Sequence, residues 1–128
     1  KENHGTFFVG TDLGFNVLSR PIMYDSHHEI EQYRDGKIIT AGEKETANVV
    51  GNICESGDIM AKDRVLFIPK EKDLIAVMDA GAYGYSMASN YNNRLRPAEV
   101  LINTDGSVQL IRRRDTLEDL IRNFPDLA

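Results

Sequence analysis

Short segments rich in β-branched and aromatic residues recur along most of the chain. Residues 6–11 (TFFVGT) are typical of a buried strand. Asp35-Gly36 and Thr104-Asp105-Gly106 stand between such segments, where they indicate tight hairpin turns. The other segments with a strand pattern are 28–34, 37–40, 46–53, 65–68, 74–78, 98–103 and 107–112. The pattern therefore predicts a series of short strands that lie close together in the sequence.

Helical spacing is clear only near the end of the chain. The apolar residues at positions i, i+3, i+4 and i+7 are Leu117, Leu120, Ile121 and Phe124. Asp115 or Thr116 can cap this helix, and Pro125 is expected to end it. Pro21 favours a second, short helix over residues 21–25.

These segments predict one mainly β domain over residues 1–128. Strands and helices do not alternate, which argues against a parallel α/β fold. We therefore expect a Greek-key-like antiparallel β-barrel or sandwich with short helices and a C-terminal helix.

Composition and charge narrow the possible functions. With 15 basic and 20 acidic residues, the net charge is −5, which disfavours a nucleic-acid partner. No apolar run is long enough for a membrane span, and we expect no membrane association. The single cysteine excludes an internal disulfide and suits a reducing, cytoplasmic location. The chain begins at Lys1 and runs almost at once into a strand pattern, as expected for a piece of a longer chain or for a processed or tagged protein.

Three groups of residues have the chemistry of a site. Cys54 and Glu55 follow a predicted strand, where a tuned thiol can act as acid or nucleophile; the alternative is a small buried residue beside a solvated carboxylate. Arg20 and Tyr24 share one helical face and suit a carboxylate, although a surface arginine packed on a ring has the same pattern. Tyr83 lies between glycines after a predicted strand, as a ligand contact or as a structural plug.

Other motifs point away from common sites. His27 and His28 are adjacent, so their side chains diverge, and we predict no metal site. Residues 86–93 (SMASNYNN) favour an ordered loop rather than a site. Neither a phosphate-binding glycine loop nor a nucleophile elbow occurs.

Three segments together resemble the diaminopimelate decarboxylase family. They are 49–58 (VVGNICESGD), 79–100 (DAGAYGYSMASNYNNRLRPAEV) and 15–24 (FNVLSRPIMY), in family order. The resemblance covers nearly the whole chain and implies the C-terminal β-domain of a two-domain, fold-type III decarboxylase dependent on pyridoxal 5′-phosphate. The barrel domain with the Schiff-base lysine would then lie outside this chain, so the fragment alone is expected to be inactive.

The resemblance also implies roles for individual residues. Arg20 and Tyr24 match substrate carboxylate ligands, and Glu55 matches a contact to the distal amino group. Cys54 matches the proton donor, and Tyr83 matches a contact to both cofactor phosphate and substrate. The family is a homodimer in which the Cys-Glu segment reaches the partner's site. Asn52 replaces the proline that the family usually has two residues before the cysteine.

These implications lead to one expected function and two alternatives. The expected reaction converts meso-2,6-diaminopimelate to L-lysine and carbon dioxide in lysine biosynthesis. A related decarboxylase acting on ornithine, lysine or arginine is the first alternative, which the Arg20–Tyr24 pair disfavours because a diamine product needs no second carboxylate site. A non-catalytic dimerisation module is the second.

Overall fold

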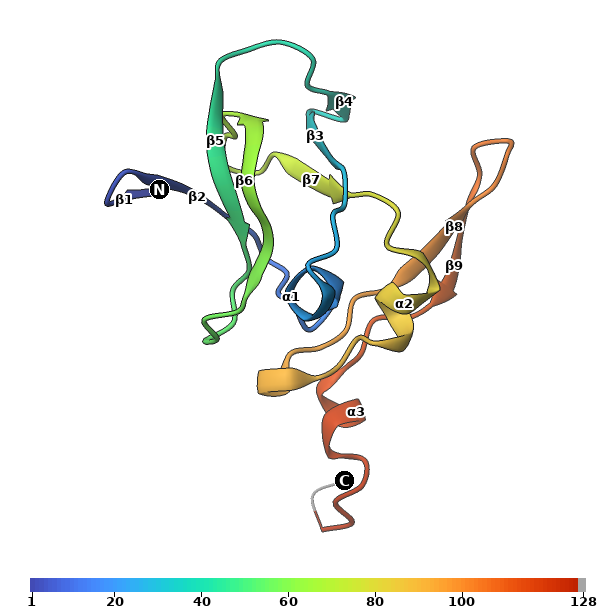
Figure 1. The fold of residues 1–128 in the computed structure, drawn as a ribbon. Coiled ribbons are helices and arrows are strands. Elements are labelled where there is room, and N and C mark those ends of the chain that lie inside the picture. Colours follow the sequence, from blue (N-terminus) through green and yellow to red (C-terminus); the bar gives the residue numbers. More distant parts are fainter. Residues whose placement is uncertain (127–128) are drawn as a thin grey trace.

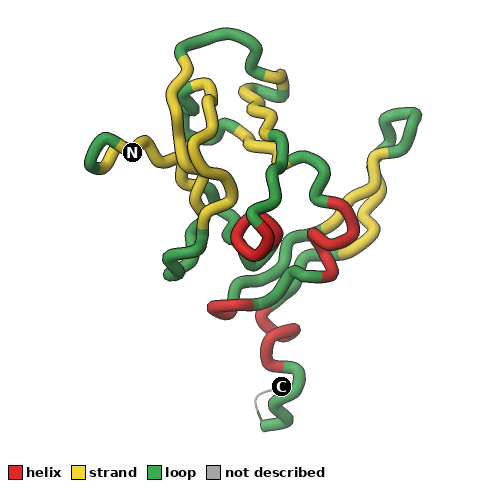
Figure 2. Tube along the Cα trace, viewed as in Figure 1, coloured by secondary structure: helices red, strands yellow, loops and turns green. Residues whose placement is uncertain are grey.

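The computed structural model describes residues 1–126, and these form a mainly β fold with short helices. Figure 1 shows strands on one side, α1 in the middle and the β8–β9 hairpin projecting outward. Figure 2 shows how much of the chain between these elements is loop. No helix within the described residues is long and apolar enough to cross a membrane.

The strands form three separate sheets instead of one closed barrel. The first has the order β1-β2-β5-β6, the second β4-β3-β7, and the third is the β8–β9 hairpin. Their bounds are β1 Glu2–Asn3, β2 Thr6–Gly10, β3 Ile30–Arg34, β4 Lys37–Ile38, β5 Lys44–Val50, β6 Ile59–Phe67, β7 Leu74–Val77, β8 Glu99–Ile102 and β9 Val108–Arg112. The expected mainly β class is confirmed, whereas a closed barrel is not formed by these residues.

The expectation of a purely antiparallel fold was wrong in one place. β2 pairs with β5 in parallel, with Phe7 opposite Ala47 and Val9 opposite Val49. A parallel pair needs a long crossover, and here β3 and β4 lie within that crossover and form part of the second sheet. Alternation along the chain cannot distinguish the two directions, because side chains alternate in both.

β6 is the longest strand, and only its end was expected from the sequence. Its middle residues are Lys62, Asp63 and Arg64, which interrupt the apolar pattern. Asp63 has φ +50°, and its N–H donates to the Asn48 side-chain oxygen at 2.8 Å. The strand therefore passes through a bulge, and a bulge breaks the period of two on which the sequence pattern depends.

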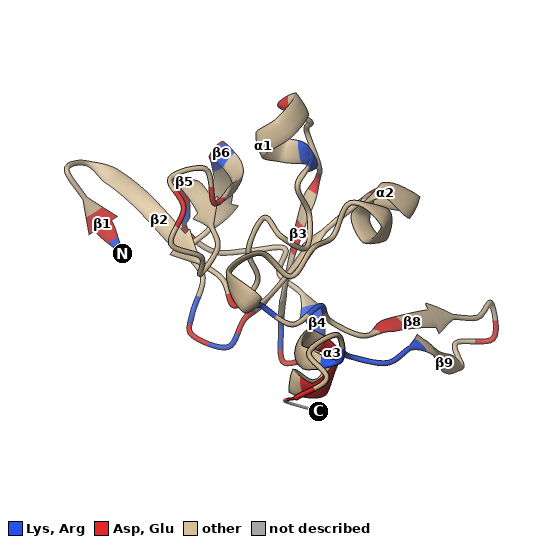
Figure 3. Ribbon diagram, turned by 90° about the horizontal axis from the view of Figure 1, so that it is seen from below, with Lys and Arg blue, Asp and Glu red and all other residues tan. Residues whose placement is uncertain are grey.

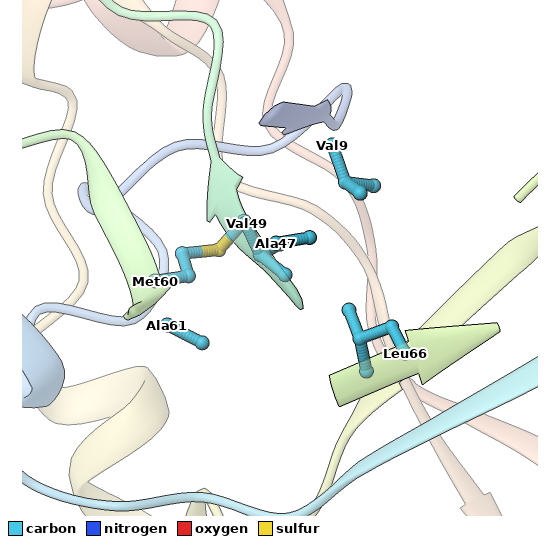
Figure 4. Close-up of a cluster of buried hydrophobic side chains, with 6 residues drawn as sticks. All are labelled: Val9, Ala47, Val49, Met60, Ala61 and Leu66. Atoms are coloured by element: carbon cyan, nitrogen blue, oxygen red, sulfur yellow. The ribbon is translucent and has the colours of Figure 1, made fainter. Parts of the chain in front are cut away.

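The hydrophobic core lies between the first two sheets. Its buried members come from β2, β5 and β6 and are drawn in Figure 4: Val9, Ala47, Val49, Met60, Ala61 and Leu66. Ile30 of β3 and Ile75 of β7 pack against this cluster from the second sheet. The core joins the two sheets into one body that holds the loops described below.

One side chain also joins the two sheets through hydrogen bonds. The Gln32 amide of β3 donates to the Phe67 carbonyl at 2.8 Å and accepts from the Phe67 N–H at 2.9 Å. This pair reproduces the two bonds that a neighbouring strand would make. Gln32 is buried, so both of its amide groups are satisfied away from water.

The helices are short. They are α1 Arg20–Tyr24, α2 Gly81–Ser86, the 3₁₀ turn η1 Tyr91–Asn93 and α3 Leu117–Ile121. The sequence pattern did not predict α2. α3 ends before Phe124, so the last residue of the predicted stripe lies outside the helix. Thr116 caps α3 as expected, in a capping box with Asp119.

Candidate active site

Arg20, Tyr24 and Tyr83 form one cluster where α1 and α2 meet. The Arg20 guanidinium carbon lies 5.8 Å from the centre of the Tyr24 ring and 5.7 Å from that of Tyr83. Both distances fit cation–π contacts, so the guanidinium interacts with both rings. The sequence separates Tyr83 from Arg20 by more than sixty positions, and the structure brings them together.

This cluster is open to solvent on its tyrosine side. Tyr24 is 60% exposed and Tyr83 is 62% exposed. The one protein hydrogen bond of the Arg20 side chain within the described residues goes to the Ser26 hydroxyl, at 3.4 Å. The remaining N–H groups of Arg20 and the two phenols can therefore bind an anion such as a carboxylate or a phosphate.

Local sequence explains how α1 presents Arg20. Pro21 occupies the first turn, where its missing N–H costs nothing. The helix ends at Asp25, whose φ of 52° is left-handed and turns the chain away after one turn. Arg20 and Tyr24 are consequently four residues apart on a single helical turn, as the sequence predicted.

Cys54 and Glu55 lie in the turn between β5 and β6, and Cys54 is exposed. The Glu55 carboxylate accepts the Gly57 N–H at 3.2 Å and the Tyr91 hydroxyl at 3.3 Å. The Glu55 carboxylate beside it raises the pKa of Tyr91, first through this hydrogen bond and then through its charge. The nearby Cys54 sulfur has the same effect on a smaller scale.

Tyr91 is a site residue that the sequence did not single out. It belongs to η1 in the segment expected to be an ordered loop, and its ring packs against Phe15 at 5.4 Å between centroids. Tyr91 and Glu55 are 36 residues apart. The only local signal was an aromatic residue within a polar segment, which does not identify a partner.

The Cys54 turn packs against α1 through Ile22. A Cβ added to Gly57 would lie 1.8 Å from the Cδ1 methyl group of Ile22, so any larger residue at this position would require the Ile22 side chain to move. Among residues 1–126 no hydrogen bond or ion pair joins Cys54 or Glu55 to Arg20, Tyr24 or Tyr83. The predicted site residues thus lie in two groups, the α1–α2 cluster and the Cys54 turn.

A network of ion pairs fixes the loop that carries Tyr91. The Asp115 carboxylate accepts from Arg96 Nε at 2.8 Å, from the Arg96 N–H at 3.1 Å and from the Asn90 amide at 3.0 Å. Figure 3 shows the basic run after β9 beside the acidic residues of α3. Arg113 there pairs with Asp119 at 2.6 Å.

The sequence of this chain is similar to those of known proteins. Residues 1–81 match the family described as "Pyridoxal-dependent decarboxylase, C-terminal sheet domain". The diaminopimelate decarboxylase of Methanothermobacter thermautotrophicus is 49% identical over 115 residues, which are 90% of this chain and 26% of that protein.

Solved structures agree with the sequence match. A crystal structure of diaminopimelate decarboxylase superposes with a TM-score of 0.90 and 40% identity, over 96% of this chain and 31% of that one. The Helicobacter pylori diaminopimelate decarboxylase complexed with L-lysine gives a TM-score of 0.85 and 37% identity, over 100% of this chain and 30% of that one. The chain spans less than a third of each of these relatives and belongs to the family of C-terminal sheet domains of pyridoxal-dependent decarboxylases.

Proposed function

We propose that this chain is the C-terminal β-domain of an enzyme that decarboxylates meso-2,6-diaminopimelate to L-lysine and carbon dioxide. The observation that carries the proposal is the open cluster in which the Arg20 guanidinium contacts the rings of both Tyr24 and Tyr83. Such a cluster binds a second carboxylate, the group that distinguishes diaminopimelate from lysine and ornithine. Similarity to enzymes named for this activity, over nine-tenths of the chain, supports it.

The residues of the cluster also fit a phosphate of the cofactor. The exposed Tyr83 hydroxyl offers a donor to a phosphate oxygen. Pyridoxal phosphate, when bound, supplies an electron sink for the bond that breaks. Tyr83 would hold its phosphate from this domain, and the lysine that binds the cofactor would lie in the barrel domain.

Each remaining site residue has a separate role in this proposal. Arg20 and Tyr24 hold the distal carboxylate of the substrate, and the Glu55 carboxylate offsets the distal ammonium group. The bond between the α-carbon and the reacting carboxylate breaks, and carbon dioxide leaves. The exposed Cys54 thiol then donates a proton to that same carbon atom.

The proposed assembly is a homodimer whose sites are shared between subunits. In the described residues no hydrogen bond or ion pair joins the Cys54 turn to the α1–α2 cluster, so in the proposed dimer the two groups of one chain can serve two different sites. We also propose that the remainder of the protein completes the sheets into a Greek-key-like barrel or sandwich. Exposed aliphatic side chains on β7, β8 and β9 support that completion.

The full parent enzyme with its cofactor tests the function. We expect it to form lysine from meso-diaminopimelate and to leave ornithine, lysine and arginine unchanged. Turnover of one of those three instead would retain the fold and the cofactor but overturn the substrate.

The variant Arg20→Ala tests the role of the cluster. We expect the KM for diaminopimelate to rise by roughly 10-fold or more, because a charge-assisted bond to a carboxylate is lost. Cofactor content, read from the visible absorbance, should stay near that of the wild type. Arg94→Ala, which removes an exposed arginine outside the cluster, is the control. An unchanged KM in Arg20→Ala would remove the assigned role.

A further inference from the structure

Asp58 is a buried carboxylate at the end of the turn that carries Cys54 and Glu55. Its side-chain oxygens accept the Ile53 N–H and the Phe15 N–H, each at 2.7 Å. Its own N–H donates to the Glu55 carbonyl at 3.0 Å, and its carbonyl accepts the Gly51 N–H at 3.0 Å. Asp58 is 4% exposed, so these bonds form away from bulk water.

Two glycines leave room for this carboxylate. A Cβ at Gly51 would lie 2.3 Å from both side-chain oxygens of Asp58. A Cβ at Gly14 would lie 3.2 Å from one of them and 2.5 Å from the Ile53 methyl group. The main chain therefore encloses the carboxylate from two loops, and the position of Ile53, just before Cys54, depends on it.

Aspartate suits this place better than asparagine. The carboxyl group accepts at both oxygens, whereas asparagine would turn an NH₂ group toward one of the two N–H donors. A buried N–H without an acceptor is costly, so the turn would rearrange to find one.

The same carboxylate connects the two supports of Glu55. Through Ile53 it holds the turn itself. Through the Phe15 N–H it holds the segment whose ring packs on Tyr91, the residue that donates to Glu55. Asp58 does not need to touch a substrate to set where the thiol and the Glu55 carboxylate lie.

We propose that Asp58 is a positioning residue for the decarboxylation: its carboxylate fixes the Cys54 thiol and the Glu55 carboxylate in the geometry the reaction needs. The proposal rests on the roles proposed above for Cys54 and Glu55. A displacement of about an ångström is enough to slow a reaction on the order of 100-fold.

The experiment compares Asp58→Asn with Asp73→Asn in the full, cofactor-loaded enzyme. Asp73 is the matched control, because it also has a buried carboxylate, which accepts from Arg34 and from the Lys70 N–H, but it lies in the loop before β7. Both variants should lose thermal stability. In Asp58→Asn we expect kcat to fall on the order of 100-fold and KM to rise, whereas both should stay near the wild-type values in Asp73→Asn. Cofactor absorbance should be unchanged in both variants.

A second measurement does not depend on the substrate. Alkylation of Cys54 by iodoacetamide, followed peptide by peptide with mass spectrometry, should be several-fold faster in Asp58→Asn than in the wild type and unchanged in Asp73→Asn. If the wild type decarboxylates another amino acid, the proposed function fails, and the alkylation rate still decides the role of Asp58.

Two results would overturn the proposal. The first is an Asp58→Asn enzyme whose kcat and Cys54 alkylation rate equal those of the wild type. The second is a loss of kcat in Asp73→Asn as large as that in Asp58→Asn. If Asp58→Asn does not fold, Gly51→Ala moves the carboxylate while retaining Asp58, and the same changes are expected. A folded Gly51→Ala enzyme with normal kcat would count against the proposal in the same way.

Discussion

Tyr91 illustrates how one side chain can set the properties of another. Its hydroxyl donates to Glu55 at 3.3 Å, and its ring is held by Phe15. The hydrogen bond fixes one oxygen of Glu55, while the Gly57 N–H fixes the other. Both oxygens thus have defined directions before any ligand arrives, which lowers the ordering cost of binding.

We expect Tyr91→Phe to raise the KM for diaminopimelate by roughly 3- to 10-fold with little change in cofactor content, because Glu55 loses one partner. Steady-state kinetics on the full enzyme measure this. Tyr33→Phe is the control, since Tyr33 also donates to a carboxylate, that of Glu31, but lies on β3. An equal rise in both variants would contradict a specific role for Tyr91.

The sequence predicted single residues well where their chemistry is local. Arg20 and Tyr24 are one helical turn apart, and the Asp35-Gly36 turn has the positive φ values that its sequence favours. Contacts between segments that are far apart in the chain could not be predicted from the sequence. The approach of Tyr83 to Arg20, of Tyr91 to Glu55 and of Phe15 to Asp58 depends on how loops cross, which no spacing along the chain encodes.

At the scale of elements, ion pairs secure the loops that strand pairing leaves free. Asp73 holds the loop before β7 through Arg34, and Asp115 holds the loop before β8 through Arg96. The sequence indicated Asp115 only as a possible helix cap and did not predict either ion pair. Local patterns likewise predicted the β8–β9 hairpin and the cap of α3, but missed most of β6, because its bulge interrupts the alternation.

These ion pairs predict a loss of stability in acid. Hydrogen bonds from Arg34 lower the pKa of Asp73 from 3.8 to about 2, and those from Arg96 and Asn90 lower the pKa of Asp115 equally. Both folded values are depressed, so the stabilisation is present above about pH 4 and is lost as the pH falls toward 2.

Melting temperature measured from about pH 6 to about pH 3 on the full enzyme tests this expectation. The melting temperature of the wild type should fall over this pH interval. The double variant Asp73→Asn, Asp115→Asn should have a lower melting temperature at about pH 6 and a smaller decrease toward about pH 3. Parallel curves for the two proteins would contradict the assignment.

The described residues have a core at one end and an exposed hairpin at the other. Val100, Ile102, Val108 and Leu110 form one face of the hairpin, paired across the strands, and each is more than half exposed. This exposed face agrees with the proposed larger enzyme, in which other parts of the protein cover the hairpin and complete the sites.

Shared sites predict rescue when two inactive enzymes are mixed. Cys54→Ala alone should lower turnover far more than cofactor affinity, and a variant of the cofactor lysine in the barrel domain should be inactive. Random re-pairing of the two makes half of the dimers mixed, each with one intact site, so activity should return to about a quarter of the wild type. Activity that stays at the level of the unmixed variants would indicate sites built within one chain.

The Gln32 bridge limits how this domain can diverge. Bonding both main-chain groups of Phe67 requires a side chain that has a donor and an acceptor in one plane at a particular reach. Asparagine is one methylene too short, and glutamate lacks the donor. Substitutions should therefore be tolerated more readily at neighbouring positions of β3 and β6 than at Gln32 itself. In a library of viable variants, Gln32 should be among the least replaceable positions that lie far from the reacting groups.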